Sequence, residues 1–280
     1  MRLEILELFG VANLVGPPVV LRRFGVPPGG PFDSGSAKAA NALLGNPLDA
    51  TVIEFGLANA RLRAQTAGEI ALAGASCEVM LDQARIELPC RVSMFTGQTL
   101  QITPPKFGAR VYLAGPGGWS AASNKRPIIP LSISAQASLS SANDSAGPEI
   151  PPQRTPTESG PIRIVPGPQA PAESEFDWSK GTFTVSHLLD RTGIRLEGPK
   201  ILPKPELVSE PACPGTIQLT NEGQLVILGP DGPTIGGYPK LACVASVDLH
   251  RLGQLRPGDE ISFQQIDFKT ARDLLVTSKG

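Results

Sequence analysis

The chain has 280 residues, of which 41% are hydrophobic and 18% charged, and its formal net charge is −1. This length fits two medium-sized domains, and the near-neutral charge gives no positive field that would attract nucleic acid or an acidic membrane surface. The apolar runs fall far below the roughly 20 residues of a membrane-spanning helix, and the N-terminus lacks a signal-peptide core. These features predict a cytoplasmic globular protein whose partners are neither nucleic acid nor membrane.

Strands and turns dominate the predicted structure. Glycine and proline number 30 and 29, and both favour turns because glycine allows positive φ and proline fixes φ. Residues 1–8 alternate between apolar and charged types and are predicted as a first strand. Alternation with a period of two predicts further strands at residues 60–64, 84–88, 99–102, 162–165, 182–185, 194–197 and 260–263. The class is therefore mainly β with few short helices.

One helix interrupts the strands of the first half. Asp33 or Ser34 can cap a segment whose small and apolar residues recur every three to four positions as far as Leu44. Gly45 and Pro47 then end it. In this reading Asp33 is explained by its capping role.

A stretch rich in serine, alanine and proline, residues 126–160, divides the chain. It is too polar and irregular to pack a core, so we interpret it as a flexible connector between domains at 1–125 and 161–280. A short helical turn is predicted after Asp248, and the strand at 260–263 is expected to close the chain.

Cysteine and histidine give no metal site. The four cysteines are far apart and form no C-x-x-C pair, which favours buried free thiols in a chain without a secretion signal. His187 and His250 are isolated, so we expect structural roles for both and no bound metal.

Six segments resemble, in the same order, motifs of the biotin-dependent carboxyltransferase-like family. This family includes allophanate hydrolase subunit 2, the carboxyltransferase part of urea carboxylase, and the C-type subunit of 5-oxoprolinase, also described as the antagonist of a sporulation kinase inhibitor. The resemblance implies two cyclophilin-like β-barrel domains. The segments are Gly25 to Asp33, Ala40 to Pro47 with Glu54, Ile164 to Gln169, Asp190 to Gly198, Pro214 to Gln218 and Gly236 to Pro239.

The function that the resemblance implies is that of a subunit in an ATP-dependent 5-oxoprolinase-type hydrolase, inactive alone. Its partners would be a related B-type (kinase-inhibitor-like) protein and a third, A-type protein of the same enzyme, with ATP bound by the complex and not by this chain alone. Two alternatives stay open. One is a non-catalytic regulatory antagonist that binds a kinase-inhibitor-like partner, and the other is the carboxyltransferase component of a urea carboxylase-like enzyme, with biotin carried by another chain.

Two carboxylates are candidate catalytic groups. Glu54 lies between Ile53 and Phe55 and suits general acid-base work if burial raises its pKa, although strand alternation could equally place it in water. Asp231 could position a nucleophile or a proton, or it could be a residue of a type I′ turn.

The resemblance also implies a set of substrate-binding residues. Gly236 and Gly237 could aim backbone N–H groups at an oxygen, or could form a simple turn. Arg195 could clamp a carboxylate with its planar fork, or could lie on an outer barrel face with Glu197. The full set is Gly29, Gly30, Arg191, Arg195, Glu197, Gln218, Thr234, Gly236, Gly237 and Tyr238.

Overall fold

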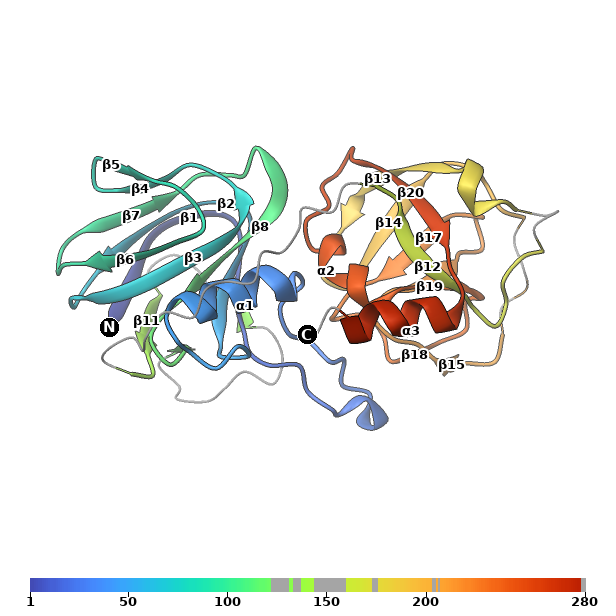
Figure 1. Cartoon of the computed structure of the whole chain (residues 1–280), viewed down its shortest axis with the longest axis horizontal. Coiled ribbons are helices and arrows are strands. Elements are labelled where there is room, and N and C mark those ends of the chain that lie inside the picture. Colours follow the sequence, from blue (N-terminus) through green and yellow to red (C-terminus); the bar gives the residue numbers. More distant parts are fainter. Residues whose placement is uncertain are drawn as a thin grey trace. The chain divides into compact units, whose positions relative to one another are not determined.

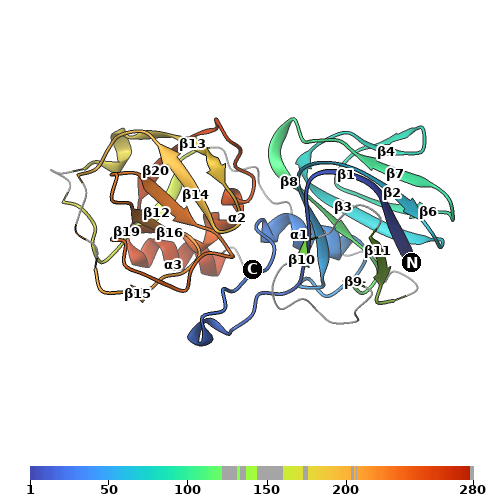
Figure 2. The same cartoon turned by 180° about the vertical axis from the view of Figure 1, so that it is seen from behind.

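A computed structural model describes residues 1–121, 131–132, 137–143, 160–172, 176–202, 205 and 207–277. The chain divides into two compact units, one made of residues 1–19 and 29–156, the other of residues 20–28 and 157–280. Each unit is built mainly of strands (Figures 1 and 2), so the predicted mainly β class is confirmed. No helix in the described part of the chain is long and apolar enough to cross a membrane.

The strands of the first unit pair, in the described residues, into one branched sheet of 11 strands. They are β1 (Arg2–Val15), β2 (Val52–Ala64), β3 (Gly68–Ser76), β4 (Val79–Leu81), β5 (Ala84–Ile86), β6 (Cys90–Met94), β7 (Thr99–Ile102), β8 (Phe107–Ala114), β9 (Trp119–Ala121), β10 (Leu131–Ser132) and β11 (Ser138–Ser141). The long antiparallel pair β1 and β2 is its centre, and bulges interrupt their register.

The sheet branches because β2 changes partner along its length. Residues 53–56 pair with β8, whereas residues 60–63 pair with β7. Leu57 lies between the two pairings with φ of 46°, a left-handed conformation that bends the strand. The two arms of the sheet thus enclose the core of this unit, in which inward side chains of β1, β2, β3, β7 and β8 meet.

The predicted helix is present as α1 (Ser34–Leu43), and Asp33 is its N-cap. The Asp33 carboxylate accepts a hydrogen bond from the backbone N–H of Ser36 at 3.0 Å. Gly45 follows the helix with φ of 63°, which suits a helix C-terminus. The apolar face of α1 packs on alanines of β3 and β8 and on Tyr112, so the helix covers one face of the sheet (Figure 1).

Part of the predicted connector belongs to the first unit. Both β10 and β11 pair with β1, and Leu139 of β11 is buried in the core. The expectation that residues 126–160 contribute to neither core is therefore wrong for Ser138–Ser141. One leucine between serines is enough for a strand that buries one face. Most of the other residues of the connector lie outside the described ranges.

Seven strands of the second unit close into a barrel, within the part of the chain that the structure describes. Its ring order is β12-β19-β16-β17-β14-β13-β20, and β12 closes it by pairing with both β19 and β20. The strands are β12 (Ile162–Pro166), β13 (Thr182–Leu189), β14 (Gly193–Glu197), β16 (Thr216–Leu219), β17 (Leu225–Leu228), β19 (Lys240–Val244) and β20 (Glu260–Gln265). A separate ribbon pairs β15 (Glu210–Pro211) with β18 (Ile235–Gly236).

Short helices complete the second unit. They are α2 (Leu249–Leu252), which confirms the turn predicted after Asp248, α3 (Phe268–Thr277), and the 3-10 helices at Arg22–Phe24, Trp178–Lys180 and Ser246–Asp248. The expectation that the strand at 260–263 closes the chain is wrong, because α3 follows it. The missed signal is Asp267, whose carboxylate accepts a hydrogen bond from the backbone N–H of Thr270 at 2.6 Å and so caps the helix.

Residues 20–28 belong to the second unit although their neighbours on both sides belong to the first. A guanidinium nitrogen (Nη2) of Arg22 donates a hydrogen bond to the carbonyl of Ala212. The second unit is therefore assembled from two stretches of chain that are distant in sequence.

Candidate functional site

A buried polar pair lies on the barrel of the second unit. Gln218 of β16 and Lys240 of β19 are directly opposite each other, so their side chains share one face. Only 4% of Gln218 and 6% of Lys240 are exposed. Both side chains need polar partners, because burying a charge or an amide without a partner costs free energy.

The β15–β18 ribbon supplies the partners of the lysine. Lys240 Nζ lies 3.1 Å from Glu210 Oε2 and 3.5 Å from the carbonyl oxygen of Gly236. Gln169 braces this arrangement, since its Oε1 accepts from the Lys240 backbone N–H at 2.9 Å and its Nε2 donates to Glu210 Oε2 at 3.4 Å. We call Gln169, Glu210, Gln218, Gly236 and Lys240 the Lys240 cluster.

Gln218 differs from Lys240 in the hydrogen bonding of its side chain. Its Nε2 is buried and, among the described residues, has no hydrogen-bond partner. Leaving such a donor unsatisfied costs about 1–3 kcal/mol. A Cβ on Gly236 would lie 3.4 Å from this nitrogen, so the glycine keeps the space beside the amide open. An acceptor oxygen placed there would meet both an amide donor and a neighbouring ammonium.

Glycine is needed at positions 236 and 237 for space and not for backbone conformation. Neither residue has positive φ. A Cβ on Gly237 would lie 2.8 Å from the carbonyl oxygen of Leu207, and the Gly237 carbonyl itself accepts a hydrogen bond from the Leu207 N–H at 2.8 Å. Of the other residues predicted for this loop, Thr234 is buried and Tyr238 is exposed.

Asp231 forms an ion pair with Arg191 instead of facing the Lys240 cluster. Arg191 Nε and Nη2 lie 2.7 and 3.0 Å from the two carboxylate oxygens, a bidentate geometry. Asp231 does not have the positive φ that a type I′ turn requires, so that interpretation is wrong. The pair holds the turn after β17 against the turn between β13 and β14.

Arg195 and Glu197 share one face of β14, as alternation predicts. Ile194 precedes Arg195, Leu196 lies between Arg195 and Glu197, and both are buried. The face that carries Arg195 and Glu197 is therefore the outside of the barrel. Arg195 is half-buried and Glu197 is exposed. In the described part of the chain, no hydrogen bond or ion pair joins either residue to the Lys240 cluster, and the role of Arg195 as a clamp stays a prediction.

The first unit holds the other predicted carboxylate, Glu54, in its interior. Glu54 is 1% exposed, which settles the choice between burial and solvent. Its Oε2 accepts hydrogen bonds from the Phe32 N–H and the Tyr112 hydroxyl, both at 2.8 Å, and its Oε1 lies 3.5 Å from Arg110 Nε. The Tyr112 hydroxyl accepts in turn from the Asp33 N–H at 2.7 Å.

This network ties the start of α1 to β2 and β8. Burial raises the pKa of Tyr112 well above its ordinary value, and the nearby Glu54 and Asp33 carboxylates raise it further. Its hydroxyl therefore stays a donor. Gly29 and Gly30, with φ of 65° and 83°, make the turn that leads into this region. The arrangement supports Glu54 as an internal anchor, and a catalytic role for it stays a prediction.

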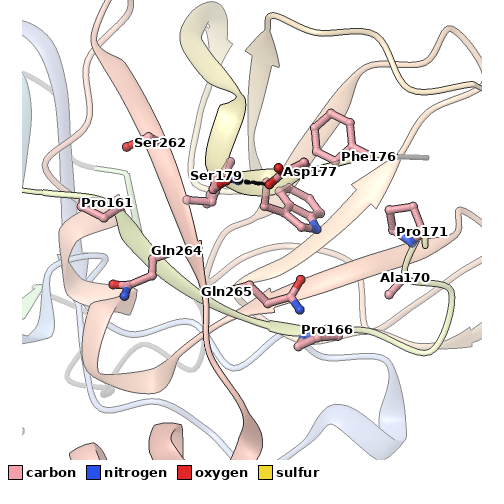
Figure 3. Close-up of a pocket in the computed structure, with 12 residues that line it drawn as sticks. Pro161, Pro166, Ala170, Pro171, Phe176, Asp177, Ser179, Ser262, Gln264 and Gln265 are labelled. Carbon is pink, nitrogen blue, oxygen red and sulfur yellow. Dashed lines mark hydrogen bonds between the residues drawn. The ribbon is translucent and has the colours of Figure 1, made fainter. Parts of the chain in front are cut away.

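A pocket of about 620 Å³ lies elsewhere on the second unit (Figure 3). Proline, aromatic and glutamine side chains dominate it, and Asp177 accepts hydrogen bonds there from Ser179. The lining residues are Pro161, Pro166, Ala170, Pro171, Phe176, Asp177, Trp178, Ser179, Ser262, Phe263, Gln264 and Gln265. It contains no predicted site residue and no member of the Lys240 cluster.

Sequence reasoning found Gln218 and Gly236 but missed three members of the cluster. Lys240 could have been noticed as a charged residue at the head of the apolar run Leu241–Ala242. Gln169 ends one of the six motifs. Glu210 has no distinguishing pattern, because only the pairing of β15 with β18 brings it to the lysine.

Comparison with known proteins gives consistent matches along the chain. The family model described as carboxyltransferase domain, subdomain A and B, matches residues 24–126 and 127–265. The C-type subunit of 5-oxoprolinase from Haemophilus influenzae is 32% identical over 271 residues, which cover 91% of this chain and 87% of that protein. The Escherichia coli protein of the same description is 30% identical over 277 residues, with 89% and 86% covered.

A solved structure extends the comparison to a larger enzyme. The crystal structure of the K. lactis urea amidolyase superposes with a TM-score of 0.88 at 25% sequence identity. The match covers 99% of this chain but 19% of that chain. This chain thus corresponds in length to one segment of that enzyme.

Proposed function

Because the chain belongs to the carboxyltransferase domain family, subdomain A and B, we propose that it is one subunit of an ATP-dependent 5-oxoprolinase-type hydrolase that opens a cyclic amide. Two relatives described as the C-type subunit of 5-oxoprolinase, each matched over most of its length, support this proposal. That description implies other subunits. The related B-type protein and the A-type protein of the same enzyme are the partners we propose.

ATP would be bound by the assembled complex. The sequence contains no G-x-x-x-x-G-K-[ST] loop, the motif that cradles nucleotide phosphates in many ATPases. The chain would then be inactive alone and contribute one wall of a shared site.

The Lys240 cluster is the observation that carries the proposal. When an amide is attacked, negative charge develops on its carbonyl oxygen, and fixed donors lower the barrier by stabilising that charge. The Gln218 amide nitrogen, which has no partner among the described residues, and the Lys240 ammonium are two such donors on one face. Glu210 and the Gly236 carbonyl balance the charge of the ammonium.

Replacement of Lys240 by methionine tests this role in the reconstituted complex. Loss of a charged hydrogen bond in the transition state corresponds to about 1.5–3 kcal/mol. We therefore expect kcat/KM for 5-oxoproline to fall roughly 10- to 150-fold. Lys180→Met is the matched control, because the Lys180 side chain is 82% exposed and forms a surface ion pair with Asp177.

Gln218→Leu provides an independent readout. Removing an unsatisfied buried donor should leave the free energy of unfolding unchanged or raise it, since leucine fills a similar volume. A structural glutamine would show the opposite. If Lys240→Met and Gln218→Leu both leave turnover unaltered in a folded complex, the cluster is not the site.

A second candidate is carboxyl transfer of the urea carboxylase type. The fold match to the K. lactis urea amidolyase over nearly the whole chain favours it, and the same donors would suit a carboxylate or the urea oxygen. Biotin would then arrive on another chain. Supplying the partner proteins with either 5-oxoproline and ATP, or urea, bicarbonate, ATP and a biotinylated carrier, separates the two candidates by the product formed.

A further inference from the structure

Two cysteines of the second unit lie side by side although 30 residues separate them in the numbering. Cys213 is in the turn between β15 and β16, and Cys243 is on β19. Thr216, the first residue of β16, is directly opposite Cys243. Cys213 folds back onto that threonine, with its N–H 3.2 Å and its Sγ 3.5 Å from Thr216 Oγ1. Paired residues of neighbouring strands place their side chains on the same face, so the Cys243 and Cys213 thiols both lie beside Thr216, and the Cys243 Sγ lies 3.7 Å from the carbonyl oxygen of Val244.

The surroundings of the pair make its two sulfurs unequal. The hydrogen bond from Cys243, that from Thr216 and the positive charge of Arg22 together lower the pKa of Cys213 to about 5, although burial opposes the shift. The pKa of Cys243 is raised by its interaction with Cys213 and by partial burial, which disfavours the thiolate. Of the two thiols, Cys213 is therefore the more acidic.

Arg22 reaches this place from the distant segment 20–28. Its Nη2 donates to the carbonyl of Ala212, the residue before Cys213. Its Nε is buried and has no hydrogen-bond partner among the described residues. The guanidinium is therefore fixed beside the sulfur and has a donor to spare for an anion. Cys213 and Cys243 are both only half-buried, so a small reagent can reach them.

We propose that Cys213 and Cys243 form a peroxide-sensitive dithiol that closes into a reversible disulfide. Cys213 is the attacking sulfur and Cys243 is the resolving one. The inference rests on the contacts of the two sulfurs and does not depend on the proposed function of the chain.

The chemistry requires hydrogen peroxide as oxidant and yields water. The Cys213 thiolate attacks one peroxide oxygen, so an S–O bond forms, the O–O bond breaks, and the departing hydroxide takes a proton to become water. Cys243 then attacks the Cys213 sulfur of the sulfenic acid. The S–S bond forms, the S–O bond breaks, and the leaving hydroxide takes the Cys243 proton. Overall, two thiols and one peroxide give one disulfide and two waters, and an external thiol reverses the change.

The bond would join two elements of the Lys240 cluster. Cys213 lies three residues after Glu210, and Cys243 lies three residues after Lys240. A disulfide would therefore fix the turn after β15 against β19, the two elements that hold the carboxylate and the ammonium.

The first unit offers a matched control pair, Cys77 and Cys90. Burial, together with the neighbouring Cys90, raises the pKa of Cys77 to about 11, and burial also raises the pKa of Cys90. Both are free and half-buried, as are the cysteines of the second unit. They share exposure with the proposed dithiol, but their pKa values are raised, so they should react slowly.

The test uses the full-length reduced chain, hydrogen peroxide at pH 7, and peptide mapping by mass spectrometry without reduction. We expect a peptide pair joined through Cys213 and Cys243 that dithiothreitol separates. Cys243→Ser should leave a sulfenic acid on Cys213 that dimedone captures, whereas Cys77→Ser and Cys90→Ser should leave the disulfide intact. Arg22→Gln should move the onset of the reaction to higher pH, because it removes a positive charge that favours the thiolate.

The pH profile and the labelling pattern decide the outcome. The charged and titratable groups that act on Cys213 are Cys243 and Arg22, so the rate should be nearly flat from pH 6.5 to 8. An ordinary thiol would speed up by about tenfold per pH unit in this range. Equal dimedone labelling of all four cysteines in the unsubstituted chain, or labelling without any Cys213–Cys243 disulfide, would overturn the proposal.

Discussion

Tyr112 connects the Glu54 carboxylate with the start of α1. It is fully buried on β8, donates to Glu54 and accepts from the backbone N–H of Asp33, the cap of α1. Removing its hydroxyl would leave a buried N–H and a buried carboxylate each short of one partner. The Tyr112 hydroxyl thus links the Glu54 carboxylate to the first residues of α1.

Tyr112→Phe should lower the free energy of unfolding by about 1–3 kcal/mol at pH 7, since it leaves buried polar groups unsatisfied. The variant should also change how the free energy of unfolding falls at alkaline pH. The folded-state pKa of Tyr112 is raised, so its contribution is complete below the unfolded pKa of about 10 and is lost as pH rises further.

Urea unfolding between pH 7 and pH 11 measures both effects. The unsubstituted chain should lose stability more steeply above pH 10 than Tyr112→Phe does. Tyr238→Phe is the control because Tyr238 is exposed. Equal alkaline slopes in all three chains would show that the Tyr112 hydroxyl is not held in its neutral form by the fold.

At the scale of elements, Asp248 connects the short helices to the barrel. It is fully buried beside α2, and its carboxylate accepts hydrogen bonds from the backbone N–H and the side chain of Arg163 on β12. Arg251 of α2 lies 3.4 Å away on the same carboxylate. Burial alone would raise the pKa of Asp248, but the hydrogen bonds and charge of Arg163 outweigh it and lower the pKa.

Asp248→Asn should destabilise the second unit by about 3 kcal/mol at pH 7, because it leaves Arg163 without its buried counter-charge. The folded pKa is lowered, so the stabilisation is present above the unfolded pKa of about 3.9 and disappears as pH falls below it. In denaturant unfolding, the difference in free energy of unfolding between the unsubstituted chain and Asp248→Asn should therefore narrow toward pH 3.

Asp273→Asn serves as the control for that measurement. Asp273 pairs with Lys269 on the surface of α3, where both side chains are more than half exposed, and such pairs contribute little. An Asp248→Asn effect no larger than that of the control would contradict the anchoring role.

The loop between β18 and β19 gives a second prediction at this scale. A Cβ at position 237 would lie 2.8 Å from a backbone carbonyl, whereas one at position 236 would meet only the end of the Gln218 side chain at 3.4 Å. Gly237→Ala should therefore destabilise the unit by about 1–3 kcal/mol, as overpacking does. Gly236→Ala should cost much less, and thermal unfolding compares the two. Equal losses of stability in the two variants would indicate that the whole loop shifts to accommodate either side chain.

Local signals explain which elements the sequence predicts. The helix α1 was predictable because its cap, its spacing and Gly45 all lie within thirteen residues. The strand β11 was missed because its single buried residue, Leu139, stands among serines. The helix α3 has no fully buried residue among those described. Its signals are the spacing of the half-buried Ala271, Leu274 and Leu275 and its cap at Asp267.

The candidate site was less predictable because pairing across the barrel creates it. Gln218 and Gly236 came from a family resemblance, whereas Lys240 and Glu210 meet only once β15 pairs with β18 and β16 with β19. Arg195 shows the opposite case. Its alternation was predicted correctly, but alternation cannot tell the inner face of a barrel from the outer one.

At the scale of the whole molecule, the two units divide the sequence unevenly. The second unit takes residues 20–28 from within the first half of the chain, and composition gives no sign of this. The assignment changes what a cut in the connector should do.

Limited proteolysis should cleave first between residues 144 and 159, the part of the predicted connector that precedes β12. The fragments should then elute together in size-exclusion chromatography, since the N-terminal fragment carries residues 20–28 of the second unit. Arg22→Ala should favour their separation by removing the bond to Ala212. Fragments that separate freely from the unsubstituted chain would contradict this division, and early cleavage within Ser138–Ser141 would contradict the pairing of β11.

The contact between Arg22 and Ala212, which are 190 residues apart, also affects the order in which the chain folds during synthesis. At synthesis rates of about 5–20 residues per second, the arginine leaves the ribosome roughly 10–40 s before its acceptor exists. During that interval the first unit can fold on either side of residues 20–28, and the segment has to wait as an open loop whose ends are already fixed. The second unit can therefore complete its fold only after Ala212 has been synthesised, long after residues 20–28.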